Sequence, residues 1–275
     1  RHDAHRLMDL SQSCFISNPW NFYLEGVANN GPPKRRETMK FATTLTLAAL
    51  GLSLSSASMA DDCCGLKIFN NATTGNLLIS DQGERAKHYA AWPDNRLIAV
   101  HAEGETVRDI LALVRQFGKH THFLHISTAQ EIADLQAAKE EGLPVTIGVC
   151  PHHLFLTEDD VATLGAYGRM KPELKTQHDV DMLWQAIANG VVDVIESDHA
   201  PHTIAEKESD PPPSGVPGLE TTLPLMLTAA QEGRVSLERV IDMVSTNPQQ
   251  IWGLDCPDET YALVDLDATY TIDNS

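Results

Sequence analysis

The sequence has little positive charge. It contains 20 lysine and arginine residues against 38 aspartate and glutamate residues, which gives a formal net charge of −18. Nucleic acids and anionic membrane surfaces reward basic patches, so this balance argues against both as partners. The cysteines show no framework spacing, which argues against a disulfide scaffold; they are Cys14, Cys63, Cys64, Cys150 and Cys256.

Long hydrophobic runs are also scarce. Residues 39–60 contain one lysine, then an apolar stretch of about a dozen residues, which is short for a transmembrane helix, and they end in small residues. This is the three-part pattern of a secretory signal, although 38 residues precede it. The alternative is a buried helix of small residues. We therefore treat residues 1–62 as an unassigned N-terminal segment.

The 275 residues are 42% hydrophobic and 21% charged, which is typical of a globular chain rather than a disordered one. The length predicts one large domain, or one domain and a fragment. From residue 63 onward, short apolar runs alternate with amphipathic patterns. We predict strands at 65–70, 96–101, 120–126, 143–150 and 191–198. We predict helices at 105–117, 127–142, 177–189, 219–232 and 237–246.

The strand and helix alternation predicts an α/β fold with parallel strands and right-handed crossovers. One helix is expected to begin at Ser127, with Gln130 completing a capping box, and to stop at Gly142. The helix at 237–246 is expected to end at Asn247-Pro248.

Four polar side chains fall near the ends of these strands. Lys67 lies in the first strand, His101 ends the second, His125 nearly ends the third and Asp198 ends the last. One buried polar residue in a strand is commonly structural, but four in register are less easily explained in that way. In a (β/α)8 TIM-type barrel the carboxyl ends of the strands build the active site.

Imidazole and carboxylate groups suit zinc or a similar divalent ion. Lys67 does not fit this set while it is protonated, because an ammonium cannot bind a cation. If its amine were carboxylated, it would supply an anionic oxygen. Two metal ions about 3.5–4 Å apart could then share it and activate a water molecule.

Several longer stretches point to a known family. They are CCGLKIFNNATTGNLL (63–78), AVHAEGET (99–106), HFLHIST (122–128), SDHAPHT (197–203) and GVPGLETT (215–222). Residues 63–275 thereby resemble dihydroorotases of the amidohydrolase superfamily, of the type found in multifunctional pyrimidine-synthesis proteins. The resemblance implies a metal-dependent (β/α)8 barrel that interconverts N-carbamoyl-L-aspartate and dihydroorotate, using two zinc ions.

The resemblance also implies roles for individual residues. Lys67 would be the carboxylated lysine that bridges the metals, and His101 and His125 would bind the second metal. Asp198 would bind the first metal and act as the catalytic acid and base. The residues expected to contact substrate are His202, Thr73, Pro217 and Gly218.

The sequence departs from this family in three respects. It has no His-x-His-x-Arg motif, which supplies two ligands of the first metal in the family. Gly148 stands where the fused-type relatives carry a glutamate, and Lys171 where they carry an arginine. We therefore expect an incomplete barrel over 63–254, the start of a truncated β segment over 255–275, and impaired activity with one zinc ion or none.

Two alternatives remain open. One is another cyclic amidase, such as a hydantoinase or allantoinase. The other is a non-catalytic dihydroorotase-like scaffold for aspartate transcarbamoylase. In each case we expect a cytoplasmic protein, either self-associating or bound to the transcarbamoylase.

Other polar groups have simpler interpretations. His152 and His153 follow Pro151 and are expected to be turn and packing residues. Cys150 ends a strand, where a peripheral position in the site is conceivable but not favoured. Glu103 is expected to serve at a helix start.

Overall fold

The computed structural model describes residues 6–8, 64–73, 75–254, 262–269 and 271. The chain divides into two compact units: Arg1–Ser17 together with Cys64–Ser275, and Asn18–Cys63. The second unit and the signal-like pattern at 39–60 lie outside the described residues, and the domain boundaries expected at 62 and 255 stay predictions. Among the described residues, no helix combines the length and the hydrophobicity of a transmembrane span.

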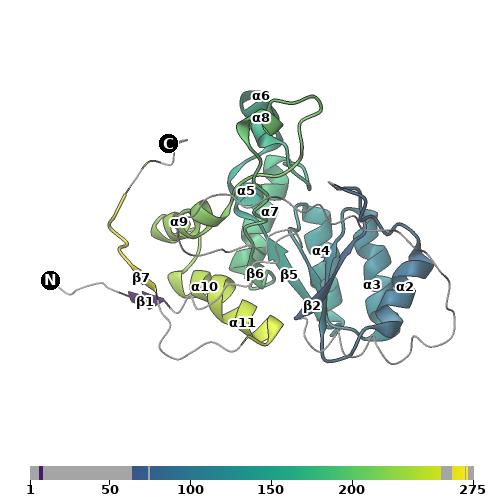
Figure 1. Ribbon diagram of the computed structural model, residues 1–275. Coiled ribbons are helices and arrows are strands. Elements are labelled where there is room, and N and C mark those ends of the chain that lie inside the picture. The colour runs from purple at the N-terminus through teal and green to yellow at the C-terminus, as the bar shows by residue number, and fades with distance from the viewer. Residues whose placement is uncertain (1–5, 9–63, 74, 255–261, 270, 272–275) are drawn as a thin grey trace, which may run out of the picture. The chain divides into compact units, whose positions relative to one another are not determined.

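The first unit is built on one parallel sheet, shown in Figure 1. Its five strands are hydrogen-bonded in the order of the sequence. They are β2 (Gly65–Phe69), β3 (Leu97–His101), β4 (Thr121–Phe123), β5 (Val145–Val149) and β6 (Val194–Ile195). The predicted α/β class with parallel strands is therefore confirmed. A separate antiparallel pair joins β1 (Arg6–Met8) to β7 (Ala262–Val264).

Helices follow the strands along the chain, as the alternation predicts. Consecutive contacts run from α2 to α3, α4, α7 and α5. The helices are α2 (Gln82–Ala91), α3 (Glu105–Phe117), α4 (Ala129–Glu140), α5 (Pro151–Phe155), α6 (Val161–Leu164), α7 (Gln177–Ala188), α8 (Ile204–Lys207), α9 (Leu219–Gln231), α10 (Leu237–Ile241) and α11 (Asn247–Trp252).

The core lies between the sheet and this helical layer. All five residues of β3 are buried, which explains why its sequence is a continuous apolar run rather than an alternating one. On α3 the residues at helical spacing, including Val107, Ile110 and Val114, are buried. Strand β3 and helix α3 thus form a buried support for the residues that follow them.

Two predicted helix boundaries are wrong. The capping box of α4 is made by Thr128 and Glu131, one residue later than expected. Glu131 also accepts hydrogen bonds from the backbone N–H groups of Ser127 and Thr128, so the loop before α4 is held by the same carboxylate. After α10 the chain does not stop at Asn247-Pro248. It continues through a π-helical turn into α11, whose first turn tolerates Pro248 because no backbone donor is needed there.

Candidate metal centre

Lys67 is the central residue of β2, where it pairs with Ala99 of β3. Burial lowers the pKa of its ammonium group, while the nearby carboxylates of Asp198 and Glu196 oppose that shift. Its Nζ lies 4.8 Å from the ring centroid of Phe69. A lysine in this setting is easier to deprotonate than an exposed one, and only a neutral amine can be carboxylated.

His101 and His125 form the centre of the group. Both side chains are buried, and their ring centroids lie 4.5 Å apart in an edge-on arrangement. Burial, followed by the charges of His101 and Lys67, lowers the pKa of His125 well below its ordinary value. His125 therefore stays neutral near pH 7, with a lone pair available for a metal ion.

The sequence predicted that His125 and Asp198 lie within strands, and this prediction is wrong. β4 ends at Phe123 and β6 ends at Ile195. His125 and Asp198 have φ angles of 40° and 41°, and they are the only non-glycine residues with positive φ in the described part of the chain. Such backbone costs about 1–3 kcal/mol and concentrates at functional sites, because surrounding contacts must enforce it.

Asp198 completes the cluster. Burial raises the pKa of its carboxyl group, the positive charge of Lys67 lowers it, Glu196 raises it and His101 lowers it. Asp198 is thus electrostatically coupled to Lys67 and to His101, and the ring contact links His101 to His125. The four predicted metal-site residues therefore lie in one region of the sheet, with Lys67 inside β2 and the other three at or beyond strand ends. The donor atoms of His101, His125 and Asp198 do not form a group within 4.8 Å of one another.

Glu196 is a neighbour that sequence reasoning missed. Its Oε1 lies 2.5 Å from Nε2 of His122, and its Oε2 accepts a hydrogen bond of 2.9 Å from the backbone N–H of His125. The carboxylate rests against Gly148, where an added Cβ would lie 2.1 Å from Oε1. Glu196 thus holds the strained backbone of His125, and only glycine at position 148 leaves room for it.

Glu103 also has a different role from the one expected. It accepts a 2.8 Å hydrogen bond from Nε2 of His101 instead of serving only at a helix start. Although burial tends to raise the pKa of Glu103, the hydrogen bond and charge of His101 and the charges of Lys175 and Lys171 lower it overall. An ionised Glu103 fixes the proton of His101 on Nε2, which leaves Nδ1 as the atom with a lone pair.

The four residues expected to contact substrate occupy two places. Gly218 packs against the residue before Asp198, because an added Cβ would lie 2.4 Å from the Ser197 carbonyl oxygen. His202 is half-buried, with Nε2 3.2 Å from the carbonyl oxygen of Ser214. Pro217 is exposed in the same loop, whereas Thr73 is half-buried in the segment after β2. The first three therefore lie on the stretch of chain that flanks Asp198.

These residues fit a metal ion. The Nδ1 atom of His125 is buried and has no hydrogen-bond partner, which is costly unless something else binds it. His101 has one nitrogen held by a carboxylate, as is usual for histidines that bind metals. Two imidazoles and a carboxylate form a donor set that suits zinc.

Comparisons with known proteins agree with this chemistry. A family model described as "Amidohydrolase family" matches residues 85–256. The chain is 39% identical over 228 residues to "Multifunctional protein CAD" of Squalus acanthias, a match that covers 81% of this chain and 10% of that protein. It is 42% identical over 156 residues to "Dihydroorotase" of Halobacterium salinarum, covering 56% of this chain and 36% of that protein.

A solved structure has a similar fold. It is described as "Inactive dihydroorotase-like domain of Chaetomium thermophilum CAD-like multifunctional protein". The TM-score is 0.65 at 24% sequence identity, and the match covers 80% of this chain and 62% of that chain. The present chain therefore spans only part of the relatives that it matches. The matched family model covers more than half of its residues, and the chain belongs to the amidohydrolase family.

Proposed function

We propose that this chain carries the metal-binding and proton-transferring groups of a dihydroorotase, a cyclic amide hydrolase of pyrimidine biosynthesis. The observation that supports this most strongly is the buried contact of the His101 and His125 rings, with Lys67 and Asp198 electrostatically coupled to each other beside it. The chain belongs to the amidohydrolase family. Members of this family are generally metal-dependent, and we propose zinc as the metal of this site. The similarity to proteins named dihydroorotase supports the choice of substrate.

Each residue has a defined task in this proposal. His101 and His125 would bind one zinc ion, and Lys67, once carboxylated, would bind it together with a second ion that Asp198 also contacts. A metal ion held by these residues would polarise the amide carbonyl and lower the pKa of a bound water molecule. Asp198 accepts a proton as water adds to the carbonyl carbon. It then delivers the proton to the ring nitrogen as the carbon–nitrogen bond breaks.

The substrate residues are proposed to work beside this centre. His202 would contact the substrate carboxylate, while Pro217 and Gly218 bring backbone close to it. Thr73 would approach from the loop after β2. The sequence given has no His-x-His-x-Arg motif. Asp198 and Lys67 would therefore be the ligands that this chain offers to the first metal, and we expect that ion to bind more weakly than the second.

A second function is favoured by one comparison. The similar structure of Chaetomium thermophilum is described as inactive and as part of a multifunctional protein. A chain of this kind would act as a non-catalytic partner of aspartate transcarbamoylase in the cytoplasm. Copurification of the transcarbamoylase with a chain that lacks hydrolase activity would support this alternative over the enzyme.

The deciding experiment is an assay of the full chain, purified with zinc and bicarbonate. We expect opening of dihydroorotate that is lost in Asp198→Asn and slower than in a full-length dihydroorotase. Turnover of hydantoin or allantoin in preference to dihydroorotate would favour a different cyclic amidase. No turnover of any of the three substrates by zinc-loaded, folded protein would contradict the enzymatic proposal.

A further inference from the structure

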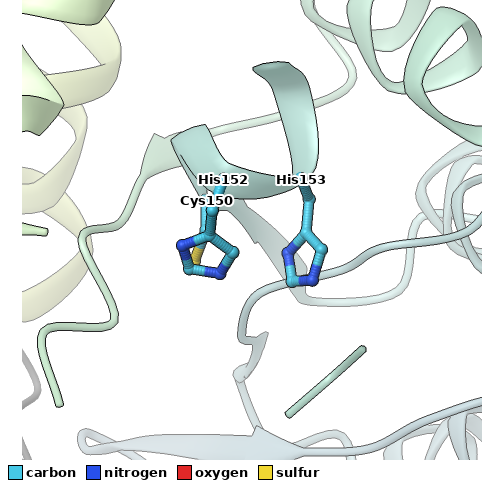
Figure 2. A group of neighbouring side chains, drawn as sticks. All are labelled: Cys150, His152 and His153. Atoms are coloured by element: carbon cyan, nitrogen blue, oxygen red, sulfur yellow. The ribbon is translucent and has the colours of Figure 1, made fainter. Parts of the chain in front are cut away.

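Beside the candidate metal centre lies a group of three side chains that the proposed function does not use. Cys150 follows β5 and is the residue before α5, and its side chain makes no capping hydrogen bond there. His152 and His153 belong to the first turn of α5. Figure 2 shows the three side chains on the same side of the ribbon.

The donor atoms of this group are close together and buried. One donor atom from each residue lies within 4.8 Å of the other two. The ring centroids of His152 and His153 are 4.4 Å apart. In tetrahedral zinc sites, bond lengths of about 2.0–2.3 Å bring ligand atoms to within about 3.3–3.8 Å of one another. Closing the gap therefore requires side-chain movements of about 1 Å, which small rotations provide.

Hydrogen bonding leaves two of these atoms unused. Nε2 of His152 and Nδ1 of His153 are buried and have no hydrogen-bond partner. A buried polar atom without a partner destabilises the folded chain, so two of them side by side need an explanation. Packing alone, which was our expectation for these histidines, does not provide one.

The partner of His153 determines which of its nitrogens can bind a cation. Nε2 lies 3.0 Å from the carbonyl oxygen of Pro172. Because a carbonyl only accepts, Nε2 carries the proton and Nδ1 carries the lone pair. Histidines that bind metals commonly donate their other N–H to a backbone carbonyl in this way.

The charge states fit the same role. Burial lowers the pKa of His153 to about 4, so this ring is neutral near pH 7. Burial also lowers the pKa of His152 well below its ordinary value. Burial raises the pKa of the Cys150 thiol, with the charges of Asp198 and Glu196 adding to the effect. The thiol would release its proton when a metal binds.

We propose that Cys150, His152 and His153 form a separate binding site for a thiophilic divalent cation, with zinc as the first candidate. One thiolate and two neutral imidazoles supply three ligands, and a fourth position is left for water or another small ligand. None of the three residues belongs to the group of Lys67, His101, His125 and Asp198. The inference therefore stands whether or not the chain is a dihydroorotase.

Sulfur ligation gives a test that the neighbouring centre cannot imitate. The full chain is prepared with Cys14, Cys63, Cys64 and Cys256 replaced by serine, so that Cys150 is the only thiol, and is titrated with Co²⁺. We expect a near-ultraviolet thiolate-to-cobalt charge-transfer band that saturates with one ion. Adding Cys150→Ser should abolish the band.

Two further variants separate this site from its neighbour. His152→Gln should weaken the cobalt binding seen in the band by at least tenfold, since loss of even an indirect metal contact costs about 10–100-fold. His101→Asn, which alters only the candidate centre, should leave the band in place. The absence of a band in folded protein, or a band that survives Cys150→Ser, would overturn the proposal.

A second measurement covers the case in which the four-serine chain does not fold. Cadmium NMR of the otherwise unaltered chain is compared with that of its Cys150→Ser variant. We expect a resonance in the thiolate-ligated range that disappears in the variant. Identical spectra of the two proteins would refute the site.

Discussion

The contact between Gly148 and Glu196 gives the sharpest test of how the centre is built. Replacing Gly148 with alanine places a Cβ 2.1 Å from Oε1 and 2.7 Å from Oε2 of Glu196. Ordinary contact begins at 3.4 Å, so the carboxylate must move by more than 1 Å. A movement of that size lengthens both of its hydrogen bonds, to His122 and to the backbone of His125.

The size of the effect follows from those two bonds. Hydrogen bonds to charged groups contribute about 1.5–3 kcal/mol each, so Gly148→Ala should lower the free energy of unfolding by about 1.5 kcal/mol if one is lost and up to about 6 if both are lost. The backbone of His125 also loses the acceptor that holds it at positive φ. Zinc affinity should therefore fall by about 10–100-fold.

Urea unfolding and zinc titration check both effects, and a double-mutant cycle supplies the control. In a Glu196→Ala background the added methyl group has room, so Gly148→Ala should cost far less there than in the otherwise unaltered chain. Equal costs in both backgrounds, or a change below about 0.5 kcal/mol in the single variant, would refute the reasoning.

Three other outcomes are expected. Glu103→Gln should keep the shape of the side chain but weaken its hold on His101, lowering zinc affinity about 10–100-fold by calorimetry; unchanged affinity would contradict this role. Arg85→Met should lower the free energy of unfolding by about 2–4 kcal/mol in urea, because two carbonyl groups lose their donor; a neutral effect would argue against it. Metal-free protein should lose stability as the pH falls below about 6.5. Burial lowers the pKa values of His125 and His153 in the folded chain, so the unfolded chain binds more protons as the pH falls. A urea midpoint that does not decrease when the pH is lowered from about 7.5 to about 5 would contradict this expectation.

Features encoded in contiguous residues were predicted well. Helix α3 matches its expected range of 105–117, because its apolar residues recur at helical spacing. The five strands were each located, although all of them are shorter than expected. Helix α2 was missed, since its buried face carries Arg85, whose guanidinium bonds backbone carbonyls rather than adding to an apolar stripe.

Features that depend on distant residues were not predictable. Glu196 meets Gly148 only because β6 pairs with β5, and nothing near either residue in the sequence marks the contact. The resemblance led us to look for a carboxylate at position 148. In the structure, the carboxylate of Glu196 occupies the space that a side chain at position 148 would take. Cys150, His152 and His153 were interpreted separately, because only the turn from β5 into α5 shows that their donor atoms share one space.

The central claim is that Lys67, His101, His125 and Asp198 form one metal centre. Crystals of the full chain grown with zinc and bicarbonate, measured at the zinc absorption edge, test it directly. The account predicts an anomalous peak between the two imidazoles, and density for a carboxyl group on Lys67 that faces this peak. Zinc bound only elsewhere, with Lys67 ending in a plain ammonium group, would contradict it.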